Sequence, residues 1–320
     1  MTDPTPSWLT ADLLRVERLI TSTAGESAHP LVREPALHLI GAGGKRLRPA
    51  LTLIASRAGE PGRLGTDLSA AALELVHLAS LYHDDVLDDT QVRRGVPTVH
   101  EKWGTDIAIL VGDYLFACGC GLGADAGGEV PGILARAIAD VCQGQIVETA
   151  TLNDPRRSVA DYEDTIRSKT AALFRAAGEL AATTSGADAN AGRALRSYGE
   201  NLGLAFQIVD DLLDLVGDPE IIGKDPGTDL KEGVFTLPVL IACEKDPELV
   251  ELLASGERDL AAVLPYLRKA GALDEALARA REFAEYARKS LTDLPPGDYI
   301  ETLATVVDGA LAQLPILDPY

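Results

Sequence analysis

Apolar positions recur at helical spacing over most of this 320-residue chain, and few stretches alternate with a period of two residues. Many segments are rich in Ala, Leu and Glu, which favour helices, whereas runs of β-branched residues are rare. Residues 66–94 contain neither Gly nor Pro, so they predict one long helix. A second helix, interrupted by two glycines, is predicted over residues 193–216. The pattern predicts an all-α protein.

Short turns separate the predicted helices, each marked by Gly, Pro, Asn or Asp. None of these connections is long enough, or skewed enough in composition, to serve as a linker between domains. Nearly half of the residues are apolar, so the chain can bury a large core. We therefore expect a single domain over residues 1–320.

The charge of the chain excludes several classes of function. There are 49 acidic and 29 basic residues, a formal net charge of −20, which argues against a nucleic-acid partner or an anionic membrane surface. The four cysteines are scattered, and no basic segment of a secretory signal precedes the first apolar residues. The longest apolar stretch, residues 107–124, contains Asp113 and many glycines. We expect a cytoplasmic protein without integral membrane association.

Two clusters of aspartates lie near the C-terminal ends of the two predicted helices. LYHDDVLDD contains Asp84 and Asp88, and FQIVDDLLD contains Asp210 and Asp214. Both have the form DDxxD, and positions i and i+4 share one face of a helix. The chain has 28 aspartates, so two such motifs are expected by chance only about 0.02 times. The repetition therefore indicates a function.

Apolar residues such as Val86 and Leu212 lie between the acids, which argues against simple solvated helix ends. Carboxylates on one helix face repel one another, so a cation is expected to offset the repulsion. Oxygen ligands without Cys or His at matching spacing suit Mg²⁺, which commonly binds one or two carboxylates, waters and a substrate phosphate. The two motifs predict a site for magnesium and a diphosphate.

Basic residues are grouped close to these acids along the chain. GGKRLRP contains two glycines whose backbone can approach a phosphate closely, VRRG follows the first motif by one turn, and RSKTAALF lies on an otherwise apolar helix. Each group alone would be an ordinary surface feature. Together they favour an enzyme that stabilises the negative charge of a diphosphate leaving group.

The segments GGKRLRP, LYHDDVLDDTQVRRG, SKTAALF, FQIVDDLLD and GKDPGTDLKEGVFTLP occur in this order, over about residues 40–240. Together they resemble the trans-isoprenyl diphosphate synthases, the polyprenyl synthetase family. The resemblance implies a helical bundle of the isoprenoid synthase type, with a central cavity between two facing DDxxD motifs, and usually a homodimer. It also implies a prenyltransferase that joins isopentenyl diphosphate head to tail to an allylic diphosphate, with three Mg²⁺ ions and a trans double bond.

The resemblance assigns roles to individual positions. Asp84, Asp88 and Asp210 would bind Mg²⁺ and, with Arg93 and Lys169, form the catalytic set, while Asp85, Asp211 and Asp214 would lie nearby or act through water. The residues that would bind isopentenyl diphosphate are Gly44, Lys45, Arg48, His77 and Arg94. The residues that would surround the allylic diphosphate are Arg93, Lys169, Thr170, Gln207 and Lys224.

In this family the depth of an apolar tunnel below the first motif sets the product length, and short-chain synthases carry an aromatic residue four or five positions before it. Ser80 and Ala79 occupy these positions here, with Val76 one turn deeper. All three are small or of moderate size, which favours a product longer than twenty carbons. Tyr82 is closer to the motif, and facing helices can also block the tunnel, so a farnesyl or geranylgeranyl diphosphate synthase stays open.

Two departures from the family pattern stand out. The family often has GK-x-T before LP, whereas this chain has Val234 after Gly233 and lacks that lysine. The C-terminus PILDPY is acidic, so we do not expect a basic tail to close over the substrate.

Other functions remain as alternatives. A class I terpene cyclase would replace the second DDxxD by N-x-x-x-S/T-x-x-x-E, which VDDLLDLVGD does not fit, and a non-catalytic subunit of a heteromeric synthase usually loses the aspartates. GCGLGA at 119–124 matches a dinucleotide pattern that should lie between a strand and a helix, but the DAGGEVPG that follows opens no helix. Two E-x-x-H pairs, Glu26 with His29 and Glu74 with His77, have the spacing of di-iron proteins, although the first lies among loop residues.

Overall fold

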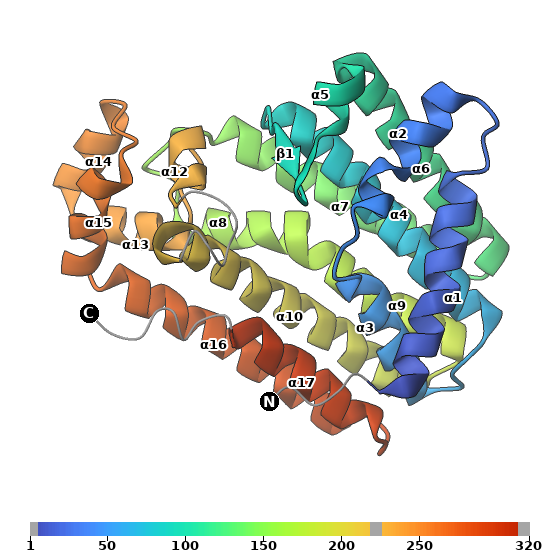
Figure 1. The fold of residues 1–320 in the computed structure, drawn as a ribbon. Coiled ribbons are helices and arrows are strands. Elements are labelled where there is room, and N and C mark those ends of the chain that lie inside the picture. The colour runs from blue at the N-terminus through green and yellow to red at the C-terminus, as the bar shows by residue number, and fades with distance from the viewer. Residues whose placement is uncertain (1–5, 218–225, 313–320) are drawn as a thin grey trace. The chain divides into compact units, whose positions relative to one another are not determined.

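The structure is a computed structural model that describes residues 6–217 and 226–312. Nearly all of the described residues are helical (Figure 1). The strands found among them, β1 (Val92–Arg93) and β2 (Val96–Pro97), form one antiparallel hairpin in which Val92 pairs with Pro97. The prediction of an all-α fold is confirmed.

The described residues divide into two compact units by their packing. Unit 1 falls within Met1–Ile138, Ala176–Arg196 and Leu294–Ile300, and unit 2 within Ala139–Arg175, Ser197–Asp293 and Glu301–Tyr320. Two compact units can still belong to one cooperative domain, so the single domain over residues 1–320 stays a prediction.

Unit 1 is built from N-terminal helices and segments of later ones. Its elements are α1 (Ser7–Ala24), α2 (Pro30–Gly41), α3 (Leu47–Ala55), η1 (Ser56–Ala58), α4 (Leu64–Leu87), the hairpin, α5 (Val99–Trp103), α6 (Thr105–Ala126) and parts of α7 (Val130–Ala150), α9 (Ala172–Ser185) and α10 (Ala189–Val216).

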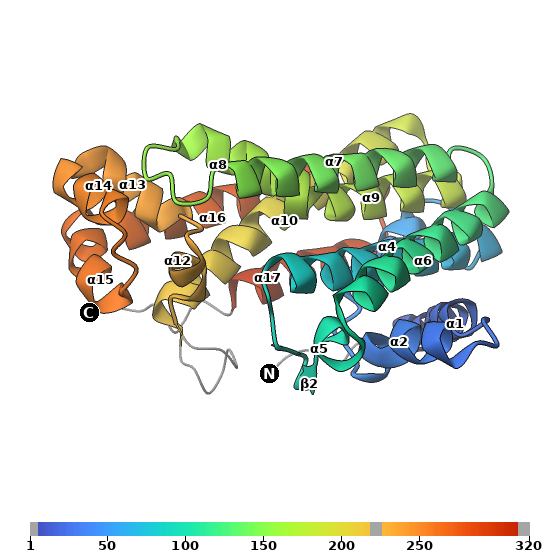
Figure 2. The same cartoon turned by 90° about the horizontal axis from the view of Figure 1, so that it is seen from above.

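Helix α4 lies at the centre of unit 1. Leu73, Leu75 and Leu78 point in different directions around this helix, yet all three are fully buried. A helix that is apolar on all sides must be covered on all sides, and α4 packs against α1, α3 and α6. Helices α4 and α6 run side by side in Figures 1 and 2. This packing fixes the helix that carries the first aspartate motif.

The prediction of one helix over residues 66–94 is wrong at its C-terminal end, because α4 ends at Leu87. Asp89 and Arg94 have φ values of 50° and 53°, in the left-handed region that an α-helix cannot accommodate. Aspartate enters this region more readily than most residues. The chain therefore leaves the helix within the motif and turns into the β1–β2 hairpin.

Unit 2 contains the remaining helices. Its elements are α8 (Val159–Ile166), the π-helical turn η2 (Arg167–Ala171), α12 (Thr228–Glu232), α13 (Leu237–Lys245), α14 (Pro247–Ala254), α15 (Leu260–Lys269), α16 (Ala272–Ser290), η3 (Leu291–Asp293), most of α17 (Tyr299–Leu311) and the other parts of α7, α9 and α10.

The long helix α10 supplies core residues to unit 2, among them the fully buried Ile208 and Leu212. It covers Ala189–Val216, which confirms the second helix predicted from the sequence. Local signals begin the neighbouring helices: Ser158 and Asp161 form a reciprocal capping box at the start of α8. The buried residues fix α10, the helix that carries the second motif, in the core of unit 2.

Within the described residues, one helix, α6, is long and apolar enough to cross a membrane by length and composition. Only 39% of its most apolar window is buried. Core helices of proteins that do not enter membranes pass the same test, and Asp113 lies in the middle of this helix with most of its side chain exposed. The burial of an ionised aspartate in lipid is costly.

Candidate functional site

The glycine-rich segment before α3 brings backbone and guanidinium groups together in unit 1. Gly44 has a φ of 149°, and a Cβ at this position would lie 2.9 Å from Arg46 Nη1 and 3.0 Å from the Arg94 guanidinium carbon. Glycine allows the loop to lie this close to both side chains. Arg94 also donates to the carbonyls of Gly43 and Leu39, so the β1–β2 hairpin is tied to this loop.

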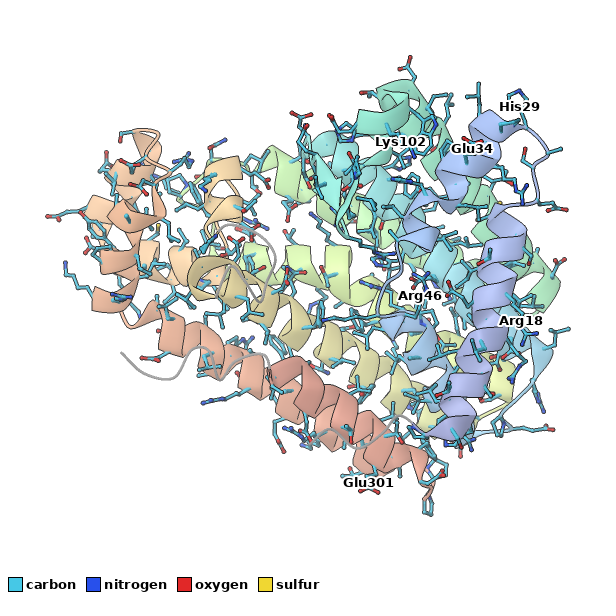
Figure 3. The ribbon with its side chains drawn as sticks, in the orientation of Figure 1. Arg18, His29, Glu34, Arg46, Lys102 and Glu301 are labelled. Carbon is cyan, nitrogen blue, oxygen red and sulfur yellow. The ribbon has the colours of Figure 1, made fainter. Side chains whose placement is uncertain are left out.

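Arg46 connects the loop to α1 and α4 (Figure 3). Its guanidinium donates to the two carboxylate oxygens of Glu17 at 2.7 and 2.8 Å, and to Glu74 at 3.3 Å. Glu74 is only 2% exposed, and this burial raises its pKa. Glu74 is thus a buried counter-ion of arginine, a role that the E-x-x-H spacing did not suggest.

Three predicted substrate contacts share this region: Arg48, His77 and Arg94. Burial lowers the pKa of Arg48 to about 10 and also lowers the pKa of Arg94. Burial and the neighbouring guanidinium groups hold the pKa of His77 well below its ordinary value. We call Arg46, Arg48, His77 and Arg94 the arginine cluster. Lys45, beside it in sequence, is exposed to solvent.

The aspartates of the first motif differ in burial. Asp85 is 2% exposed and accepts a hydrogen bond from Arg93 Nε, while burial raises its pKa. Asp84 is half-buried and Asp88 is exposed. The backbone N–H of Asp88 donates to the Asp84 carbonyl at 2.9 Å, so one helical turn still joins the two. Arg93, predicted to contact substrate, is therefore also paired with the motif itself.

The three residues predicted to influence product length lie one and two turns before this motif on α4. Val76 and Ala79 are buried, and Ser80 is half-buried with its hydroxyl donating to the His77 carbonyl at 2.9 Å. The nearby Tyr82 donates its phenol hydroxyl to the Pro35 carbonyl on α2 at 2.6 Å. The hydrogen bond fixes the Tyr82 ring toward α2.

The second group of predicted contacts lies in unit 2, where the π-helical turn η2 carries Lys169 and Thr170. π-helical turns are rare and occur frequently at functional sites. Lys169 Nζ pairs with Glu148 of α7. Thr170 Oγ1 donates to Gln207 Oε1 on α10 at 2.7 Å. The structure thus brings together three of the residues predicted around the allylic diphosphate.

A hydrogen-bonded chain continues from Gln207 into the second motif. Gln207 Nε2 donates to Asp211 Oδ1 at 2.7 Å, and the Tyr162 hydroxyl of α8 donates to Asp211 Oδ2 at 2.5 Å. Asp211 is 3% exposed, and burial raises its pKa to about 7. Tyr162 was missed by sequence reasoning. A signal was present, since Tyr162 precedes Lys169 by seven residues, two helical turns on one face.

The other two aspartates of the second motif, Asp210 and Asp214, also differ in burial. Asp214 is fully buried, its carboxylate accepts the Asp229 N–H at 3.2 Å, and its carbonyl accepts the Gly227 N–H at 2.6 Å. Asp210 is exposed to solvent. Lys224, predicted to contact the allylic diphosphate, lies outside the described residues.

Burial therefore divides the six aspartates into two sets. Asp85, Asp211 and Asp214 are buried and hydrogen-bonded within the protein, whereas Asp84, Asp88 and Asp210 are at least partly exposed. Within each unit, the exposed aspartates offer carboxylate oxygens, the hard ligands that suit Mg²⁺. The exposed set is the same set that the family resemblance assigns to the metal.

Among the described residues, one compact group of potential metal ligands occurs outside the six aspartates: Asp89, His100 and Glu101. An imidazole ligand suits transition metals better than Mg²⁺. This group does not include either E-x-x-H pair, and His29 lies in the exposed connection between α1 and α2, where it caps α2 (Figure 3). The GCGLGA sequence lies inside α6, without a preceding strand.

Comparisons with known proteins extend these observations. The polyprenyl synthetase family model matches residues 29–267. The nonaprenyl diphosphate synthase of Mycobacterium tuberculosis is 37% identical over 306 residues, 93% of this chain and 91% of that protein. The short chain isoprenyl diphosphate synthase of Methanothermobacter thermautotrophicus is 37% identical over 308 residues, 92% of this chain and 94% of that protein.

Solved structures agree with this result. The crystal structure of a polyprenyl synthase from Caulobacter crescentus CB15, complexed with calcium and isoprenyl diphosphate, has a TM-score of 0.89 to this chain. The two sequences are 38% identical, and the match covers 95% of each chain. The comparisons confirm the predicted family, the all-α fold and the prediction of a prenyltransferase. The chain belongs to the polyprenyl synthetase family.

Proposed function

We propose that this protein is a Mg²⁺-dependent synthase that adds isopentenyl diphosphate to an allylic diphosphate, head to tail and with a trans double bond. Asp84, Asp88 and Asp210 would bind the metal, three ions per active site when diphosphate is bound. Arg48, His77 and Arg94 of the arginine cluster, with Gly44 and Lys45, would bind isopentenyl diphosphate. The allylic diphosphate would contact Arg93, Lys169, Thr170, Gln207 and Lys224.

The observation that carries this proposal is the arginine cluster. Three guanidinium groups in a chain of net charge −20 gather around one buried carboxylate, Glu74. Burial lowers the pKa of Arg48 and Arg94, which means that their charged forms are poorly solvated. A bound dianion would stabilise them, through hydrogen bonds assisted by charge.

The residues of the chain would act mainly through charge and position. Bound Mg²⁺ would supply charge stabilisation for the diphosphate as it leaves. Lys169 and Arg93 would add hydrogen bonds to the same leaving group as the allylic C–O bond breaks. His77, whose pKa is held low, would stay neutral and donate or accept a hydrogen bond beside the second substrate.

The carbon skeleton would then be extended in a second step. The double bond of isopentenyl diphosphate attacks the allylic carbon, a new carbon–carbon bond forms, and one proton is lost to the released diphosphate. We propose a product longer than twenty carbons, because the positions before the first motif are small and Tyr82 is fixed toward α2. The nonaprenyl name of one relative supports this length, and the short-chain name of the other keeps the alternative open.

A second copy of the chain is the partner that we propose for α6. Ile109 and Leu110 on this helix are 41% and 62% exposed, an unusual exposure for large apolar side chains. A protein partner accounts for them better than lipid does, because Asp113 on the same helix would be costly in a bilayer. We therefore propose a cytoplasmic homodimer.

Incubation of the purified chain alone with labelled isopentenyl diphosphate, Mg²⁺ and primers of different length tests the proposed reaction. We expect polyprenyl diphosphates, sized by reversed-phase thin-layer chromatography. Asp84→Ala and Asp210→Ala should each lower turnover by several orders of magnitude without loss of helix content. Near-normal turnover in either variant would contradict the metal assignment.

Asp106→Ala and Asp164→Ala are matched controls, since both remove an exposed aspartate from a helix of the corresponding unit. Both should retain turnover. Cyclic hydrocarbon products would instead identify a terpene cyclase, and a folded chain that turns over only with an added second protein would identify a subunit of a heteromeric synthase.

A further inference from the structure

Tyr162 lies outside every set of residues that the family resemblance assigns, yet it makes a short hydrogen bond to the second aspartate motif. Its hydroxyl donates to Asp211 Oδ2 at 2.5 Å, and its side chain is 3% exposed. A buried tyrosine hydroxyl requires a partner. Here that partner is a carboxylate next to Asp210, a proposed metal ligand.

The carboxylate of Asp211 is held on both sides by neutral donors. Tyr162 binds one oxygen, and the side-chain amide of Gln207 binds the other at 2.7 Å. A carboxylate with both oxygens bound has one orientation, so the side chain of Asp211 is held in one place between α10 and α8.

The same chain of hydrogen bonds reaches the π-helical turn. The oxygen of the Gln207 amide accepts from Thr170 Oγ1 at 2.7 Å. Because the Asp211 carboxylate accepts from the nitrogen of this amide, a flip would turn the amide oxygen toward the carboxylate and lose that bond. Tyr162 is therefore connected through Asp211 and Gln207 to the hydroxyl of Thr170, which lies beside Lys169.

We propose that Tyr162 is a positioning residue for the allylic diphosphate: through Asp211 and Gln207 it fixes the second aspartate motif and the hydroxyl of Thr170 in the orientation that binds this substrate and its metal. This inference rests on the proposed function. It predicts a selective effect, because the residues proposed to bind isopentenyl diphosphate belong to unit 1 and have no part in the chain of hydrogen bonds.

Tyr162→Phe removes one hydroxyl and keeps the ring. We expect the dissociation constant of an unreactive allylic analogue, farnesyl thiolodiphosphate with Mg²⁺, to rise roughly tenfold, the effect of one lost hydrogen bond to a charged group. The Mg²⁺ concentration for half-maximal binding of the analogue should rise as well. The dissociation constant of isopentenyl diphosphate should change less than twofold. Isothermal titration calorimetry measures all three.

Tyr198→Phe is a matched control in the same unit. Tyr198 is also fully buried and donates one hydrogen bond, to the Leu303 carbonyl at 2.7 Å, but it does not touch the motif. Both variants lose a buried hydrogen bond, so both should lose stability, Tyr162→Phe somewhat more because its partner is a carboxylate. Only Tyr162→Phe should weaken the allylic analogue.

Equal affinity of the two variants for the analogue would overturn the inference, as would a parallel loss of isopentenyl diphosphate binding in Tyr162→Phe. In the steady state, the KM for the allylic primer should rise in Tyr162→Phe while the KM for isopentenyl diphosphate stays unchanged. Absence of turnover by the unmodified protein would refute the proposed function alone, since binding of the analogue does not need turnover.

Discussion

Replacement of Gly203 by alanine should force α10 away from the π-helical turn in unit 2. A Cβ at this position would lie 2.6 Å from the Cα of Ala171 and 2.9 Å from its Cβ. Ordinary contacts of this kind begin near 3.4 Å. The nearest atom belongs to the backbone, so no side-chain rotation can relieve the overlap.

The magnitude follows from two opposing terms. Overpacking of a closely packed contact costs about 1–3 kcal/mol, and a shortfall of about 0.8 Å against the backbone belongs at the upper end of that range. Alanine regains about 0.5–1 kcal/mol, because glycine is unfavourable inside a helix. The free energy of unfolding should therefore fall by about 1–2 kcal/mol. Ala171 adjoins Thr170, so the affinity for the allylic primer should fall too.

Gly192→Ala on the same helix provides the control. The nearest atom to its added Cβ would be the Cβ of Ala182 at 3.6 Å, an ordinary contact. This variant should gain about 0.5–1 kcal/mol. Thermal unfolding followed by circular dichroism at 222 nm should show a midpoint lower by about 2–5 °C for Gly203→Ala and slightly raised for Gly192→Ala. A midpoint for Gly203→Ala at or above that of the unmodified protein would refute the reasoning.

Three further changes test other parts of the molecule. Ala79→Phe should shorten the product, sized by thin-layer chromatography, and an unchanged distribution would mean that other residues limit its length. His77 has a pKa well below its ordinary value of about 6.5, so below about pH 6.5 the unfolded chain binds one more proton and stability falls as the pH falls. His77→Asn should lose less stability than the unmodified protein between pH 7.5 and 5.5, measured as the urea concentration at the unfolding midpoint. Identical changes in this midpoint for the variant and the unmodified protein would contradict the prediction. Leu110→Glu should convert the proposed homodimer to a monomer in light scattering, whereas an unaltered mass would place the interface elsewhere.

Local signals in the sequence were sufficient for the fold class, and the family motifs were sufficient for the prediction of a prenyltransferase. Helical periodicity and composition predict helices without knowledge of their partners, because both depend on neighbours within a few residues. The two DDxxD motifs and the basic segments are also short local patterns, and these patterns indicate magnesium and diphosphate. Three of the residues that the family resemblance assigns to isopentenyl diphosphate, Arg48, His77 and Arg94, lie close together in unit 1.

Errors arose where the backbone conformation of single residues decides the result. The absence of Gly and Pro from residues 66–94 predicted an unbroken helix, but Asp89 and Arg94 adopt left-handed conformations that composition does not reveal. Glu74 was considered only as an iron ligand. Its partner Arg46 lies 28 residues away, and Arg46 in turn pairs with Glu17, another 29 residues away. No local pattern connects the three residues.

The sequence by itself determined that this chain is helical and carries two acidic motifs with basic residues near them, since these are properties of neighbouring residues. Only the tertiary structure decided which aspartates are buried anchors and which face solvent. Asp84 and Asp85 are adjacent and chemically identical, as are Asp210 and Asp211, so their difference in burial comes from the helices packed around them. The role of Tyr162 has the same origin, because α8 meets α10 only in the folded chain.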